Sequence, residues 1–214
     1  MEEIMKLSKK VKVAALLMSA LLVFVFAAES SRMLYGSAKV KGSKSFGPDF
    51  EYDYSACVDI EIDDEGRIIQ ISDKEKNTEA AIDAGSLGHP EYNKPYWKKY
   101  LDGKGFEKFK NLTLEDVKKM DVGFPGTPGV DAVGGATAAS LAVKNAVLQA
   151  LVLDASLKEL VNYKNPDNYK KGEQKKLEKI IKEGRTHLET LETYEEIEKA
   201  LAELKQKMDA LKTK

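Results

Sequence analysis

The stretch DAVGGATAAS, residues 131–140, runs directly into an apolar segment, 141–153, that the sequence predicts to be helical. Gly134 and Gly135 stand just before the helix start, and Thr137 falls in its first turn. The first N–H groups of a helix lack partners inside it, and with the positive end of the helix dipole they favour an anion, most naturally a phosphate. Glycine has no Cβ, so a ligand can approach the backbone closely. An ordinary helix start with a threonine near its cap would use the same residues, so the spacing alone assigns no ligand.

The pattern of this stretch resembles the flavinylation signature of the FMN-binding domain family. That signature is an Asp, then Ser/Gly-Gly-Ala-Thr, then a Ser or Thr three residues on, and the matching residues are Asp131, Gly134, Gly135, Ala136, Thr137 and Ser140. The family includes a flavin-carrying component of the sodium-translocating NADH:quinone reductase and many extracytoplasmic electron-transfer lipoproteins. In the family the threonine hydroxyl carries FMN through a phosphoester bond made by a flavin transferase. The resemblance therefore assigns that bond to Thr137, with Gly134 standing where a Ser is common.

The resemblance covers approximately residues 34–153 and implies an α+β domain with an antiparallel meander sheet packed by helices. It also implies a Thr-Glu and a Gly-containing loop near the flavin ring, for which the candidates are Thr78-Glu79 and Leu87-Gly88. His89 is a further candidate neighbour of the flavin, although a lone loop histidine is more often a surface or packing residue. The other signature residues are expected to line the phosphate site or to be recognised by the transferase. The Asp131 carboxylate is expected to help hold a magnesium ion while the bond is made.

Alternating apolar and polar residues predict the strands of this sheet. The clearest alternation runs from Tyr52 to Ile62, and a shorter one covers 34–41. The turn Asp63–Gly66 joins the longer strand to a further strand at 67–72, so the two form a hairpin. The sequence thus provides a sheet on which the helix after residue 140 can pack.

The segment between the hairpin and the signature contains weaker signals. Residues 87–92 predict a loop, and Trp97 and Tyr100 are expected in the core rather than stacked on a flavin ring. Thr113 with an acid three residues later predicts a helix N-cap. The proline- and glycine-rich run 124–129 predicts a rigid connector without helix.

The helical spacing places Thr137, Ser140 and Lys144 on one face of the predicted helix. This face differs from the broad apolar face, whose residues are Leu141, Val147, Leu148, Leu151 and Val152. The Thr137 hydroxyl is therefore expected to stay accessible while the helix packs on the sheet. Lys144 could pair with a phosphate, but a solvated lysine is the ordinary expectation.

The last 60 or so residues have a different, highly charged character. Asn165-Pro166-Asp167 breaks the chain, and 169–184 predicts an amphipathic helix with Leu177, Ile180 and Ile181 as its apolar stripe. A capping box at Thr193 and Glu196 predicts another helix, in which a heptad-like series follows: Ile197, Leu201, Leu204, Met208 and Leu211. With the end of the preceding helix as a third surface, these predict a three-helix bundle that weakly resembles the FIVAR-type repeats of bacterial cell-surface proteins.

The N-terminus predicts export. Four lysines, at positions 6, 9, 10 and 12, precede the apolar run 13–28, which indicates a signal peptide or an uncleaved membrane anchor. The predicted organisation is therefore a signal or anchor at 1–31, an FMN-binding domain at 32–153 and a helical bundle at 154–214.

Composition argues against several classes of function. A formal net charge of -1 argues against a nucleic-acid partner, and the single cysteine, Cys57, excludes an internal disulfide. Cys57 falls on the polar face of its strand, where a catalytic role would need a histidine brought from elsewhere. The only two histidines, His89 and His187, cannot make a multi-histidine metal site, so neither a metal nor a catalytic constellation is expected.

These features together predict a flavoprotein on the extracytoplasmic face of a bacterial membrane, with FMN bonded to Thr137. It would relay electrons from a membrane reductase or the quinone pool to an external acceptor, as a carrier rather than a stand-alone catalyst. Two alternatives remain at this point. One is a cell-surface interaction module that uses the helical bundle, and the other is a subunit of a flavin-containing ion-translocating redox complex.

Overall fold

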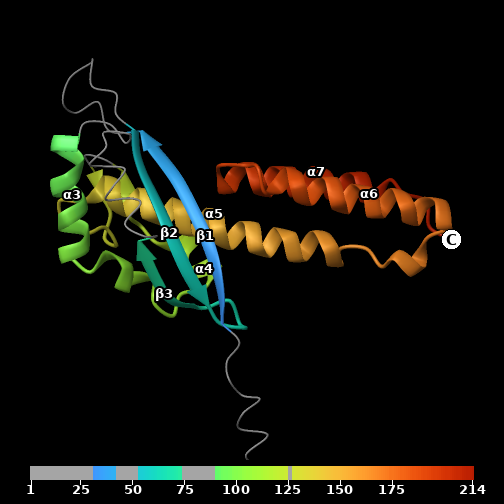
Figure 1. Cartoon of the computed structure of the whole chain (residues 1–214), viewed down its shortest axis with the longest axis horizontal. Helices are drawn as coiled ribbons and strands as arrows, with labels where there is room; N and C mark the ends of the chain where they lie inside the picture. Colours follow the sequence, from blue (N-terminus) through green and yellow to red (C-terminus); the bar gives the residue numbers. More distant parts are fainter. Residues whose placement is uncertain (1–30, 42–52, 74–89, 125–126) are drawn as a thin grey trace, which may run out of the picture. The chain divides into compact units, whose positions relative to one another are not determined.

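The computed structural model describes residues 31–41, 53–73, 90–124 and 127–214, which form an α+β fold (Figure 1). From Arg32 to Lys214 the chain forms one compact unit. Several predicted features lie outside the described residues: the export segment 13–28 and the loop candidates Thr78, Glu79, Leu87, Gly88 and His89.

The sheet is a three-stranded antiparallel meander, and its strands lie where the alternation predicts them. Its strands are β1 (Arg32–Lys41), β2 (Asp53–Ile62) and β3 (Ile68–Asp73), hydrogen-bonded in the order β1-β2-β3. The inward residues of β2 are almost fully buried, from Ala56 at 0% exposure to Ile62 at 1%. The predicted hairpin is confirmed, with β3 shifted by one residue at each end relative to the expected 67–72.

One long helix, α5 (Thr137–Asn162), packs across the inner face of this sheet (Figure 1). Gly36 of β1 lies against the backbone of α5 so closely that a Cβ there would overlap the carbonyl oxygen of Ala146. The middle of α5 is buried on nearly every side, which agrees with its long apolar run.

Short helices connect the sheet to α5: α3 (Pro90–Asp102), η3 (Gly105–Phe109) and α4 (Leu114–Lys119). The predicted loop at 87–92 is wrong from Pro90 onward, because the fixed φ of proline suits the first position of a helix. Trp97 and Tyr100 are core residues as expected, stacked with ring centroids 5.3 Å apart. The predicted cap at Thr113 is confirmed as a full capping box with Asp116.

The proline- and glycine-rich connector contains no helix in its described residues, as predicted. It carries two short strands, β4 (Gly123–Phe124) and β5 (Thr127–Pro128), which pair with each other in antiparallel fashion. This small ladder comes directly before the signature stretch.

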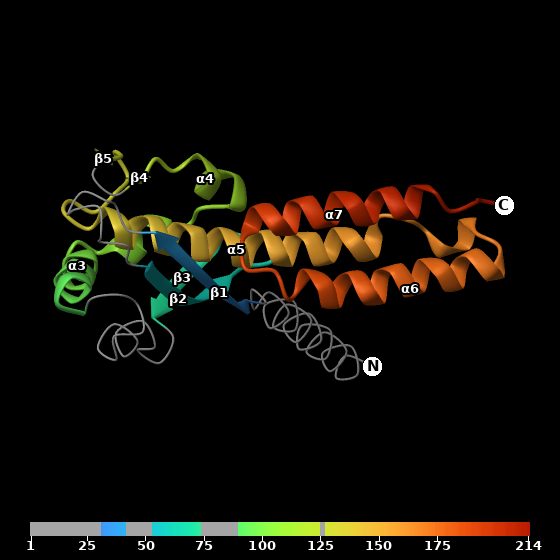
Figure 2. The ribbon, with the colours of Figure 1, turned by 90° about the horizontal axis from the view of Figure 1, so that it is seen from above.

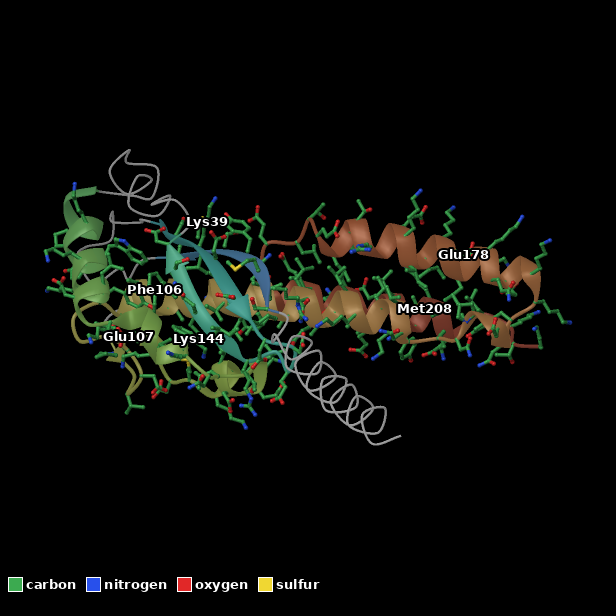
Figure 3. The ribbon with its side chains drawn as sticks, turned by 60° about the horizontal axis from the view of Figure 1, so that its bottom comes forward. Lys39, Phe106, Glu107, Lys144, Glu178 and Met208 are labelled. Carbon is green, nitrogen blue, oxygen red and sulfur yellow. The ribbon has the colours of Figure 1, made fainter. Side chains whose placement is uncertain are left out.

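The C-terminal part is a three-helix arrangement of α5, α6 (Lys171–Leu188) and α7 (Tyr194–Asp209), as predicted (Figure 2). The predicted break is the short helix η4 (Pro166–Asn168), and the capping box of Thr193 with Glu196 is present. The heptad-like residues from Ile197 to Met208 are buried. In Figure 3 Met208 lies between the helices, whereas Glu178 points away from them.

The helix α5 contributes residues to two hydrophobic cores, one after the other along its length. Its first half contributes to the core under the sheet, and its second half contributes residues such as Leu160 to the core of the bundle. The helix runs without interruption through the boundary that the sequence predicts between residues 153 and 154. Among the described residues, the helical segment Thr137–Asn168, which begins with α5, is also the one helix that is long and apolar enough to cross a membrane. Most of its apolar part is buried inside the protein.

Candidate functional site

The candidate site is the start of α5. Gly135 has a φ of +73°, a left-handed conformation that turns the chain into the helix, and Ala136 follows as the N-cap residue. Alanine has no side-chain oxygen, so this helix begins without the side-chain cap that Ser, Thr, Asp or Asn would supply. Thr137 is the first residue of the helix and is half-buried. Among the described residues, its hydroxyl makes no hydrogen bond.

The backbone around Thr137 can receive an anion. Where the structure describes the chain, the N–H groups of residues 137–139 make no hydrogen bond outside the helix, and the helix geometry gives them none inside. Among the described residues, and apart from the chain neighbours of Gly134, no atom lies within 4 Å of a Cβ built on this exposed glycine, which leaves space beside the loop there. Unpaired donors, the helix dipole and open space together make a surface on which a phosphate could sit.

A cation lies beside the same loop. A Cβ built on Gly135 would lie 3.5 Å from Nζ of Lys99, which comes from the last turn of α3. The ammonium group is exposed and lies 5.3 Å from the centre of the Tyr96 ring. Lys99 thus adds a positive charge to a loop whose backbone donors already favour an anion.

Ser140 holds the loop in shape. Its side chain is 3% exposed, and its hydroxyl accepts a hydrogen bond from Val133 N–H and donates one to the Ala136 carbonyl, both at 3.0 Å. The predicted common face of the helix is therefore present only in part, because Thr137 and Lys144 are half-buried while Ser140 is buried. The buried hydroxyl ties the residues before the helix to its first turn and is not exposed to a ligand.

Asp131 also stabilises the backbone before the helix through hydrogen bonds. Its carboxylate accepts a hydrogen bond from Asp121 N–H at 2.7 Å, and its own N–H donates to the Asp121 carbonyl at 2.8 Å. Asp131 also lines a cavity of about 390 Å³, together with Lys108, Leu112, Asp116, Lys119 and Met120. The described residues contain no group of three or more metal-ligating side chains, so any ion at Asp131 would need ligands from elsewhere.

Lys144 contacts the backbone at Met120, before the chain reaches Asp131. Its ammonium donates to the Met120 carbonyl at 2.6 Å, and Figure 3 shows it on the side of α5 where α4 lies. Burial lowers the pKa of Lys144, while the negative charges of Asp121 and Asp131 oppose that effect. The lysine expected to be solvated is instead half-buried and fixes the backbone that leads to the signature stretch.

The structure therefore brings together Asp131, Gly134, Gly135, Ala136, Thr137 and Ser140 at one helix start, where the two glycines are exposed and Thr137 is half-buried. Sequence reasoning missed Lys99 and Asp121. Lys99 gave no signal because its helix was not predicted, and Asp121 is ten residues from its partner with only a charge to mark it. Compared with protein-family models, curated proteins and solved structures, the chain finds no match.

Proposed function

We propose that this protein is an electron-transfer flavoprotein that carries FMN bonded through its phosphate to the hydroxyl of Thr137. The observation that carries the proposal is the position and hydrogen bonding of Thr137. It is the first residue of a helix whose start is uncapped, and its hydroxyl makes no hydrogen bond among the described residues. A hydroxyl that supports the fold through no bond of its own can be esterified without unfolding the helix start.

The surroundings of Thr137 fit a phosphate diester. The free N–H groups of the first turn and the Lys99 ammonium supply donors and positive charge for the phosphate oxygens. Since no described atom beyond its chain neighbours lies within 4 Å of a Cβ on Gly134, a ribityl chain would have room beside this residue. When bound, the flavin would supply the redox chemistry, and the residues of the protein would hold and orient it.

The remaining signature residues support the site indirectly. Ser140 and Asp131 fix the loop through hydrogen bonds to Val133, Ala136 and Asp121. They preorganise the backbone that a flavin transferase would have to recognise. The export segment at the N-terminus, with its lysines before the apolar run, would put the flavin outside the cytoplasm, where a covalent bond prevents loss of the cofactor.

The test is coexpression of the full chain with a flavin transferase, followed by a denaturing gel viewed under ultraviolet light. We expect a fluorescent band from the wild type and from Thr137→Ser, which keeps a hydroxyl, and no fluorescence from Thr137→Ala. The matched control is Thr186→Ala, because Thr186 is an exposed helical threonine away from this site.

Two outcomes would contradict the proposal. Fluorescence that persists in Thr137→Ala would place the bond on another residue. A folded wild type that never becomes fluorescent would favour the alternative of a surface interaction module built on the helical bundle.

A further inference from the structure

The signature stretch starts at the base of a closed loop, residues 121–131. The Asp131 carboxylate accepts a hydrogen bond from Asp121 N–H at 2.7 Å, and Asp131 N–H donates to the Asp121 carbonyl at 2.8 Å. The two ends of the loop approach so closely that a Cβ on Gly129 would overlap the Asp121 carboxylate. The loop between them carries the short β4–β5 ladder. The position of Asp131 therefore depends on the position of Asp121.

One ammonium group fixes Asp121 in turn. Lys144 of α5 donates from Nζ to the Met120 carbonyl at 2.6 Å, and the Lys118 carbonyl lies 3.5 Å away. Both carbonyls are at the C-terminal end of α4, where a cation is favourable. The Met120 carbonyl and the Asp121 N–H belong to the same peptide group. This group is thus bonded to Lys144 on one side and to Asp131 on the other, and each bond polarises the other.

Lys144 also balances charge at the base of the loop. Burial lowers the pKa of Lys144, and the negative charges of Asp121 and Asp131 act in the opposite direction, so the ammonium interacts with both carboxylates. A neutral side chain at position 144 would leave these two carboxylates to repel each other without this cation. Lys144 therefore stabilises the base of the loop through a hydrogen bond and through its charge.

Hydrogen bonds continue from this base to the residue that would carry FMN. Ala136 N–H donates to the Val133 carbonyl at 2.9 Å, and Thr137 follows directly. Lys144 comes seven residues after Thr137, about 10 Å further along the helix axis. Its ammonium is bonded to the Met120 carbonyl. Any effect of Lys144 on Thr137 would therefore pass through the loop and not through contact with the phosphate.

We propose that Lys144 is a positioning residue for FMN attachment, an inference that rests on the proposed function. Its ammonium holds the peptide group between Met120 and Asp121, and Asp131 with it, in the arrangement that a flavin transferase recognises. Attachment forms an ester bond between the Thr137 oxygen and the FMN phosphorus of FAD, and it breaks the phosphoanhydride bond of FAD. AMP leaves and the proton of the hydroxyl passes to AMP or solvent, so the step needs no oxidant or reductant.

The experiment measures the steady-state rate of FMN attachment to the purified full-length apoprotein, with a flavin transferase and FAD, at several protein concentrations. In Lys144→Met only a fraction of the protein would hold the recognised arrangement, and such a fraction raises the apparent KM while kcat stays the same. We expect the KM for the protein to rise about tenfold, the effect of losing one hydrogen bond from a charged group. Lys144→Arg keeps the charge and the donors, so it should restore most of the loss.

Controls separate positioning from a general loss of stability. Leu160→Ala weakens the core of the bundle and should leave both KM and kcat unchanged. Hydrogen exchange of the apoprotein gives a readout that needs no flavin. The amides of Asp121 and Asp131 should exchange faster in Lys144→Met than in the wild type. They should keep the wild-type rate in Lys199→Met, which changes an exposed lysine of α7.

The outcomes distinguish this inference from the proposed function. A flavinylated wild type with an unchanged KM in Lys144→Met would overturn the role of Lys144 and leave the proposed function in place. A KM that rises equally in Leu160→Ala would also overturn it, because the effect would then come from lower stability. A wild type that never takes up FMN would overturn both.

Discussion

Gly134 and Gly135 are adjacent, yet their backbones place different demands on a side chain. Gly135 has a φ of +73°, and Lys99 lies beside the place where its Cβ would be. Gly134 has no positive φ, and no described atom outside its chain neighbours lies within 4 Å of the place where its Cβ would be. The left-handed conformation favours glycine strongly, whereas open space tolerates any small side chain.

We therefore predict that Gly135→Ala lowers the free energy of unfolding by about 1 kcal/mol, the usual cost of a left-handed non-glycine residue. Gly134→Ser should leave the free energy of unfolding within about 0.5 kcal/mol of the wild type, as for other exposed positions. Urea unfolding followed by circular dichroism measures both values. An equal loss in the two variants would show that the loop needs both glycines for another reason.

At this scale the sequence predicted only part of the candidate site. It identified Thr137 and the helix start, because glycines before an apolar helix are local signals. It did not predict that Ser140 is buried, because its partner Val133 reaches it only through the fold of the loop. The pairs of Asp131 with Asp121 and of Lys144 with Met120 also depend on where the loop travels, which no spacing encodes.

Among the elements, α7 begins with a capping box whose stability should depend on pH. The Thr193 hydroxyl accepts a hydrogen bond from Glu196 N–H at 3.3 Å, and Thr193 N–H donates to the Glu196 carboxylate at 3.1 Å. Hydrogen bonds from the Thr193 hydroxyl and then from its backbone N–H hold the pKa of the Glu196 carboxyl below its usual value. A carboxyl with a lowered pKa in the folded state stabilises that state above its unfolded pKa, and this contribution disappears as the pH falls through the folded value.

We predict that Glu196→Gln is less stable than the wild type at pH 7, since an amide accepts the same hydrogen bond without the charge. The difference should shrink as the pH falls from about 5 to about 3, roughly the range in which glutamate titrates. Urea unfolding of both proteins at several pH values gives the comparison. As a control, Glu195→Gln changes a neighbouring exposed acid outside the capping box. A difference that grows on acidification would refute the assignment.

The sequence predicted the elements with strong local patterns: the β2–β3 hairpin, both capping boxes and the heptad-like face of α7. It failed at α3, because the loop signal of His89 and Pro90 conflicts with the tendency of Pro90 to start a helix. The aromatic residues of that helix are held by tertiary contacts, such as the 5.4 Å packing of Tyr100 against Phe106. Such contacts lie beyond the range of a periodicity argument.

At the scale of the whole described molecule, α5 connects the sheet core to the bundle core. Further contacts link the same two parts. Gln149 of α5 accepts from Ser37 N–H of β1 and donates to the Leu191 carbonyl between α6 and α7, both at 3.4 Å. Lys118 of α4 pairs with Glu198 of α7 at 2.8 Å. A helix shared by two cores, with contacts on both sides of it, favours unfolding of both parts in a single transition.

The sequence instead predicts a domain boundary between residues 153 and 154, and one substitution distinguishes the two descriptions. Leu160 is fully buried in the bundle core, so Leu160→Ala should lower the free energy of unfolding by about 2–5 kcal/mol. The only tryptophan, Trp97, lies in the sheet core and reports on that part by fluorescence, while circular dichroism is dominated by the helices. With a shared α5, Leu160→Ala should move both urea transitions by the same amount, and Val161→Ala, at a 50% exposed neighbour, should move neither. The contrary outcome is a fluorescence transition of Leu160→Ala that stays at the wild-type midpoint while the circular dichroism transition shifts. The sheet would then unfold independently of the bundle, and the boundary predicted from the sequence would separate two independently stable parts.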